Sequence, residues 1–235
     1  MRKYWAVLLP ITALALAGCK VGLDTNTFSD ESTVSAAIDH VDIDSDSGSV
    51  TVEVGGGSTT VRRHVQYGDT KPGSTTSVSG RTLRLNGCGD GCSVDYQVRV
   101  PAGTYVTGSA ASGSLQLDGV ASVDVHADSG SVRVQHVDGR VRAVTESGSV
   151  DVGDVRGGVD VSADSGDVHV STSAPCDVSA RTSSGSVHVD VAAGAYRVST
   201  ESGDGHAKVA VPNSPSAAHS LRVSTDSGSI DVGSH

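Results

Sequence analysis

The amino-acid sequence predicts an all-β fold, namely a single-stranded β-solenoid (β-helix-like) of coils about 18 residues long with a hairpin insertion. Three observations lead to this prediction: the composition, a repeated Ser-Gly motif and period-two hydrophobicity. Of the 235 residues, 38 are Val, 36 are Ser and 29 are Gly, whereas only 4 are Glu and 10 are Leu. Because Val favours strands while Ser and Gly favour turns, a helical bundle or an α/β fold is excluded.

The Ser-Gly motif, usually preceded by Asp or Glu, recurs at a nearly constant interval. Six successive motif glycines are 17, 18, 18, 19 and 18 residues apart. They are Gly113, Gly130, Gly148, Gly166, Gly185 and Gly203. In repeats of this kind each unit is one supersecondary element, and equivalent turns of stacked units lie above one another. A β-sandwich is the alternative, but sandwich strands need not share one turn sequence at a fixed spacing.

Two short alternating segments flank each motif glycine. Val123 and Val125 precede Gly130, for example, and Val132 and Val134 follow it. Alternation with period two places these side chains on one face of a strand and the polar residues between them on the other. Each unit therefore supplies two strands and two turns, and it buries its Val residues only when it stacks on its neighbours.

Two intervals depart from the period. Gly48 and Gly113 are 65 residues apart, and we predict the hairpin insertion over residues 55–100. A second, 25-residue interval precedes Gly228. Its extra length includes residues 212–216, where two prolines favour a surface loop.

The chain begins with a targeting segment. A basic pair, Arg2 and Lys3, precedes an apolar stretch that ends in Leu16-Ala17-Gly18-Cys19. This ending resembles the bacterial lipobox, and the resemblance implies cleavage before Cys19 and a diacylglycerol group on the Cys19 thiol. The alternative is an ordinary secretory signal with an incidental cysteine, and either signal exports the protein.

The targeting segment divides the chain into three parts. We predict a lipoprotein signal peptide over residues 1–18, a lipid-anchored polar linker over residues 19–37 and the β-repeat domain over residues 38–235. The mature protein is expected to be extracytoplasmic and anchored to the cell membrane as a lipoprotein.

Three cysteines follow Cys19. Cys88 and Cys92 lie in a glycine-rich turn between two alternating segments, which indicates a hairpin, and an oxidising compartment would allow a disulfide between them. A metal site would need more ligands than this pair has nearby. Cys176 is left over, and we interpret it as a small buried apolar residue, with a free thiol as the alternative.

The lipobox, the Cys88/Cys92 turn, residues 94–104 and the Ser-Gly repeats together resemble an adhesin-like β-strand-repeat family, of which exported members are common in actinobacteria. The resemblance covers residues 38–235. It implies a repetitive all-β domain on the cell envelope, without established enzymatic chemistry, and it supplies no catalytic residues.

Two rows of side chains are candidate metal ligands. Stacking would align the carboxylates of the Ser-Gly motifs, which could hold calcium, and three histidines beyond the motif glycines, which could bind zinc or become charged near pH 6. The rows are Asp46, Asp128, Glu146, Asp164, Glu201 and Asp226, and His169, His188 and His206. The competing interpretation is that Asp and Ser accept hydrogen bonds from turn N–H groups and that the histidines lie on a solvated face. We favour it and predict no metal site and no cofactor.

Charge and composition also limit the function. The net charge of −10 argues against a nucleic-acid partner. A Ser-Gly pair in every coil indicates turn chemistry rather than a catalytic nucleophile, and aromatic residues for stacking sugars make up only 3% of the chain.

We therefore predict a non-enzymatic, lipid-anchored envelope protein with an adhesin-like interaction surface for a protein or glycan partner. The alternatives are an envelope-stress sensory or scaffold module and, less favoured, a carbohydrate-active β-helix enzyme. The last repeat ends at Asp231 and Val232, close to the end of the sequence. Open strand edges there predict end-to-end self-association or pairing with a strand of a partner.

Overall fold

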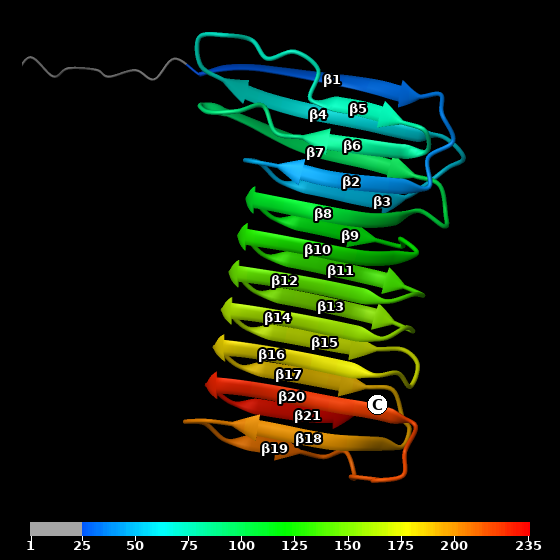
Figure 1. Ribbon diagram of the computed structural model, residues 1–235, viewed down its shortest axis with the longest axis vertical. Coiled ribbons are helices and arrows are strands. Elements are labelled where there is room, and N and C mark those ends of the chain that lie inside the picture. Colours follow the sequence, from blue (N-terminus) through cyan, green and yellow to red (C-terminus); the bar gives the residue numbers. More distant parts are fainter. Residues whose placement is uncertain (1–24) are drawn as a thin grey trace, which may run out of the picture.

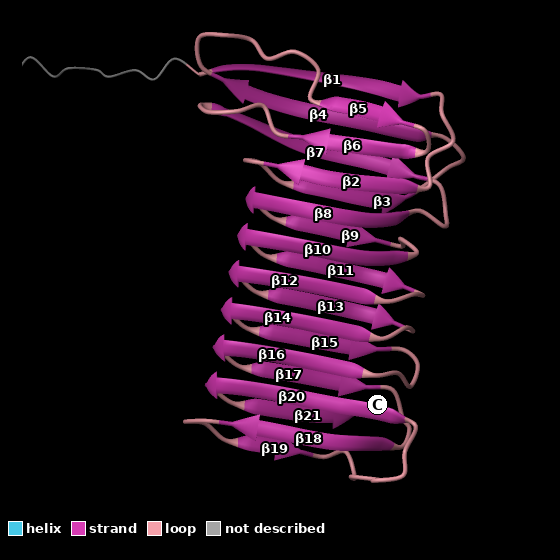
Figure 2. Ribbon diagram, viewed as in Figure 1, coloured by secondary structure: helices cyan, strands magenta, loops and turns pink. Residues whose placement is uncertain are grey.

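The computed structural model describes residues 25–235, which form 21 strands and no helix (Figures 1 and 2). The all-β prediction is therefore confirmed for this part of the chain. No helix among these residues is long and apolar enough to cross a membrane. The signal peptide and Cys19 lie outside the described residues.

The strands form two mixed sheets, an 11-stranded sheet A and a 10-stranded sheet B. In spatial order, sheet A contains β1 (Asn26–Val34), β4 (Thr59–Tyr67), β7 (Cys92–Val100), β3 (Val50–Val54), β9 (Leu115–Asp118), β11 (Val132–Val137), β13 (Val150–Val155), β15 (Val168–Thr172), β17 (Val187–Val191), β21 (Ile230–Ser234) and β19 (Ala207–Val209). Sheet B contains β5 (Thr76–Ser79), β6 (Thr82–Asn86), β2 (His40–Ser45), β8 (Tyr105–Ser112), β10 (Ser122–Ser129), β12 (Val141–Ser147), β14 (Val159–Ser165), β16 (Val178–Ser184), β20 (His219–Ser227) and β18 (Tyr196–Ser202).

Most of the chain is organised in rungs, each consisting of a sheet B strand, a turn and the following sheet A strand. Equivalent strands of neighbouring rungs pair in parallel and in register, so that Val123 lies beside Val141 and Val132 beside Val150. All four side chains are buried between the sheets, as the alternation predicts. The apolar rows therefore join into one core along the stack.

At both ends of the stack, the rungs do not follow chain order (Figure 1). Rung β2–β3 lies between β6–β7 and β8–β9, and rung β20–β21 lies between β16–β17 and β18–β19. The expectation for residues 55–100 thus needs correction, because β6 and β7 are not a side hairpin but pair in parallel with β2 and β3 and add a rung.

The position expected for the open end is also wrong. Asp231 and Val232 lie in β21, which pairs with β17 on one side and β19 on the other. The long interval before Gly228 gives the chain enough length to return and insert its last rung. The exposed end of the stack is therefore β18–β19.

The predicted polar linker is partly a strand. Residues 26–34 form β1, which pairs antiparallel with β4, and β4 pairs antiparallel with β7. Ion pairs join β1 to β4, with 2.7 Å from Arg63 to Asp30 and 2.7 Å from Arg62 to Glu31. The strand lacks apolar alternation because it is mostly exposed, so the sequence pattern could not reveal it. Its charges also make this sheet edge a poor template for pairing with another chain.

The Ser-Gly turn is explained by the close stacking of the rungs. Gly148 has φ of 146°, a conformation that side chains disfavour, and a Cβ on it would collide with the carbonyl oxygen of Gly130. The Gly148 N–H donates to the Ser165 carbonyl of the next rung at 2.9 Å. The Gly130 carbonyl accepts a further hydrogen bond from the buried hydroxyl of Thr145 at 3.1 Å. Glycine is therefore required by both the backbone conformation and the lack of space.

Tyr96 is the largest fully buried side chain near the β1 end. Its hydroxyl lies 2.9 Å from the Thr75 carbonyl oxygen and 2.7 Å from the Asn86 carbonyl oxygen. These contacts attach the loop before β5 to the core.

Tyr96 should make the protein sensitive to alkaline pH. Burial raises the pKa of Tyr96 from 10.0 to about 12. Because the folded pKa lies above the unfolded one, its contribution to stability is complete below pH 10 and is lost as the pH rises towards 12. We expect the stability difference between wild type and Tyr96→Phe, measured by urea unfolding, to fall by on the order of 2 kcal/mol over this range. Parallel stability curves for the two proteins would contradict this.

Cys88 and Cys92 form a disulfide with a Cα–Cα distance of 5.6 Å. It closes the turn between β6 and β7, where other rungs have the Ser-Gly turn. The cross-link spans a sequence separation of 4, and closing so short a loop is worth about 2 kcal/mol in the chain-entropy model.

Reduction of this disulfide is expected to lower the free energy of unfolding by about that amount. The measurement is denaturant unfolding with and without a reductant. The Cys88→Ala/Cys92→Ala variant is the control, since it should match the reduced protein and not respond to the reductant. A wild type that is equally stable in both conditions would disprove the stabilising role.

Candidate functional site

The carboxylates of the Ser-Gly turns lie in a row along one edge of the stack. The pairing of β10, β12 and β14 places Asp128 beside Glu146 and Glu146 beside Asp164. All three are exposed. Glu201 does not belong to the row, because it pairs with Ser224.

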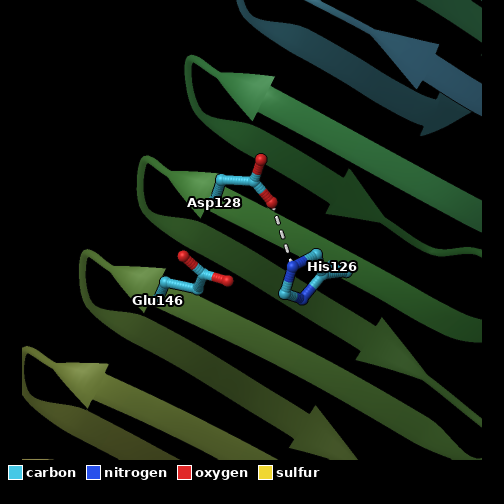
Figure 3. Close-up of side chains that lie close together, drawn as sticks. All are labelled: His126, Asp128 and Glu146. Atoms are coloured by element: carbon cyan, nitrogen blue, oxygen red, sulfur yellow. Dashed lines mark ion pairs between the residues drawn. The ribbon is translucent and has the colours of Figure 1, made fainter.

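The structure adds a histidine to this row (Figure 3). His126 Nε2 lies 3.0 Å from Asp128 Oδ1, and the ligand atoms of His126, Asp128 and Glu146 lie within 4.8 Å of one another. The sequence signal was available, because residues two apart on a strand share a face. Such a set could hold a divalent cation, with water as a further ligand. The side chains of His126 and Asp128 are 42% and 51% exposed, so hydration competes with metal binding. A protonated His126 would also pair with Asp128 without any cation.

Only two of the three predicted ladder histidines lie together. His169 pairs with His188 across β15 and β17, and their rings stack with centroids 4.9 Å apart and 5° between planes. His206 lies in the turn before β19, because Gly205, not Gly203, stacks on Gly228. In the row that begins with His169 and His188, the next residue is Asp231 and the one after it is Lys208. His206 therefore has no place in this row.

Cys176 is free and 6% exposed. Burial, together with the nearby Asp177 carboxylate, raises the pKa of its thiol to about 11. The thiol is therefore protonated at neutral pH and a poor nucleophile. Its burial fits the interpretation as a small apolar core residue.

A family model described as Toastrack DUF4097 matches residues 35–233. The chain belongs to this family. The match supports the adhesin-like resemblance seen in the sequence. No curated protein matches this Toastrack chain.

Solved structures with some similarity to the Toastrack chain carry adhesion-related names. A "putative cell adhesion protein" from Clostridium sporogenes ATCC 15579 has 11% identity and a TM-score of 0.44, over 89% of this chain and 100% of that chain. A "putative adhesin" from Parabacteroides distasonis ATCC 8503 has 15% identity and a TM-score of 0.45, over 89% and 98%. Another from Bacteroides fragilis NCTC 9343 has 14% identity and a TM-score of 0.40, over 88% and 97%.

Proposed function

We propose that the protein is a non-enzymatic, lipid-anchored β-solenoid that presents an adhesin-like interaction surface outside the cytoplasm. The observation that carries this proposal is the character of the outer faces, where polar and charged side chains form long rows across neighbouring strands. Cross-strand ion pairs join many of them, such as Arg142 to Asp124 at 3.2 Å on sheet B and Arg99 to Glu53 at 2.7 Å on sheet A. An extended surface of this kind suits contact distributed over many residues.

The anchor at Cys19 would orient the stack. Six residues separate Cys19 from the start of β1 at Asn26, and an extended chain of that length spans at most about 25 Å. The β1 end would therefore stay close to the membrane. The β18–β19 end, which lies at the opposite end of the stack in Figure 1, would point away from it.

Lipid labelling in a bacterium that processes lipoproteins tests the anchor. Cells that express the wild type should incorporate a labelled fatty acid into the protein and retain it in the membrane fraction. Cys19→Ala should lose the label, whereas Cys176→Ala should keep it. An unlabelled wild type would rule out the anchor.

Surface cross-linking in intact cells tests the interaction surface. A photoreactive residue at Arg142, on the outer face, should give discrete adducts with an envelope protein or glycan. The same residue at the buried Val141 provides the control. Absence of adducts from several outer-face positions would contradict the proposal.

Self-association is proposed at β19 rather than β21. Val209 on β19 is 38% exposed, and β19 pairs with β21 alone. The neighbouring β18 is partly covered, since the Asn213 side chain accepts a hydrogen bond from the Val198 N–H at 3.0 Å. Sedimentation at high concentration should show association that Val209→Lys removes. A strictly monomeric wild type would refute it.

A further inference from the structure

A groove of about 500 Å³ crosses the outer face of sheet B from the start of β12 to β20. Its floor consists of small residues in outward positions: Gly158 just before β14, Ser179 on β16 and Ser220 on β20. Long side chains border it, namely Arg140, Arg181 and Arg222 together with Asp160 and Asp177.

The arginines of the groove outnumber the carboxylates that can pair with them. Asp160 forms ion pairs with two of them, since its carboxylate lies 3.1 Å from Arg181 and 3.8 Å from Arg140. The side chains of Arg140 and Arg181 are both more than half exposed. Arg84 on the same face, by contrast, has a carboxylate partner of its own, since it lies 2.7 Å from Asp42.

Arg222 has no carboxylate within 4 Å among residues 25–235, and it donates to the Ser220 hydroxyl at 3.2 Å. Asp177 is already engaged, since its carboxylate accepts hydrogen bonds from the Ser220 N–H at 2.7 Å and the Ser220 hydroxyl at 2.9 Å. These hydrogen bonds lower the pKa of Asp177. Hence the groove is a place where this acidic protein displays unpaired positive charge.

Guanidinium groups bind phosphate and carboxylate oxygens in a planar, two-pronged geometry. Arg140 and Ser220 are three strands apart in one outward row, or roughly 14 Å at the spacing of neighbouring strands. One small oxyanion cannot bridge that length, whereas a chain with repeated anionic groups can.

We infer that this groove binds an anionic polymer through its phosphate or carboxylate groups, with Arg140, Arg181 and Arg222 as the ligand-binding residues. The inference rests on the proposed role as an interaction surface and names the chemistry of the partner.

Calorimetric titration of the purified protein tests the inference with four probes. These are poly(glycerol phosphate), polygalacturonate, neutral dextran and inorganic phosphate. The first two distinguish phosphate from carboxylate as the recognised group. At least one of them should bind at least tenfold more tightly than inorganic phosphate, and dextran should not bind. Affinity should fall as salt is raised.

Variants show whether the groove is the site. Arg222→Gln and Arg181→Gln should each weaken binding of the preferred polymer about tenfold, the usual effect of losing a charge-assisted hydrogen bond. Arg84→Gln, which removes a paired arginine on the same face, should change it less than twofold. Asp160→Asn should tighten binding severalfold, because it frees Arg140 and Arg181.

The inference is overturned if neither polyanion binds, or if Arg84→Gln weakens binding as much as Arg222→Gln. It is also overturned if Asp160→Asn binds more weakly than wild type. These results would leave the lipid anchor and the surface cross-links unaffected, so failure of the groove is distinguishable from failure of the proposed function.

Discussion

Gly148→Ala is expected to destabilise the protein by about 3 kcal/mol or more. The residue has φ of 146°, where a side chain is strained, and its Cβ would collide with the carbonyl oxygen of Gly130. The backbone cannot move away without breaking the hydrogen bond from Gly148 N–H to Ser165. Urea unfolding followed by circular dichroism measures the loss.

Two other glycines separate the causes of this effect. Gly56 has φ of 75°, but a Cβ on it would meet no atom within 4 Å, so Gly56→Ala should show conformational strain without collision. Gly57 has open space and no positive φ, so Gly57→Ala should be neutral or slightly stabilising. If Gly148→Ala is as stable as Gly57→Ala, the claim that the turns stack too closely for a Cβ at Gly148 is wrong.

Val152→Asp is expected to cost more than 4 kcal/mol, enough to prevent cooperative folding. Val152 lies on β13 in the middle of the stack and is fully buried, so the new carboxylate would have neither water nor a partner. Val78→Asp is the matched control. Val78 is 44% exposed on the edge strand β5, where the same change should shift stability by no more than about 0.5 kcal/mol. Similar losses in both variants would contradict the assignment of inward and outward faces.

The composition and the repeat were sufficient to predict the strands and the core of the regular rungs. Alternation at Val132 and Val134 predicted which side chains are buried, and the Ser-Gly spacing predicted where the chain turns. Both signals are local, so they could be found in a single sequence.

The order of the rungs could not be predicted in this way. Successive rungs carry nearly the same apolar pattern. Pairing β16 with β18 or with β20 would therefore continue the same rows of buried side chains equally well. His206 was misplaced for a related reason, since the turn at Gly205 is two residues longer than the motif at Gly203 suggests. Strand β1 was missed because charge pairs hold it, and charge pairs leave no periodic signal.

The interleaved order also creates the groove. Arg222 lies beside Ser179 because β20 inserts next to β16. If the rungs followed chain order, β18 would occupy that position and Arg222 would lie one strand further along the stack. The proposed polymer site therefore depends on the interleaving.

Engineered disulfides test the interleaving most directly. His188 and Lys208 both lie beside Asp231, on opposite sides of it. Neighbouring strands are about 4.8 Å apart, within disulfide range, whereas strands two apart are about 9.6 Å apart and out of range. In a Cys19→Ala/Cys176→Ala background, His188→Cys with Asp231→Cys should cross-link on oxidation, and His188→Cys with Lys208→Cys should not. Cross-linking of the 188–208 pair, without that of the 188–231 pair, would show that the rungs stack in chain order and would contradict the structure described above.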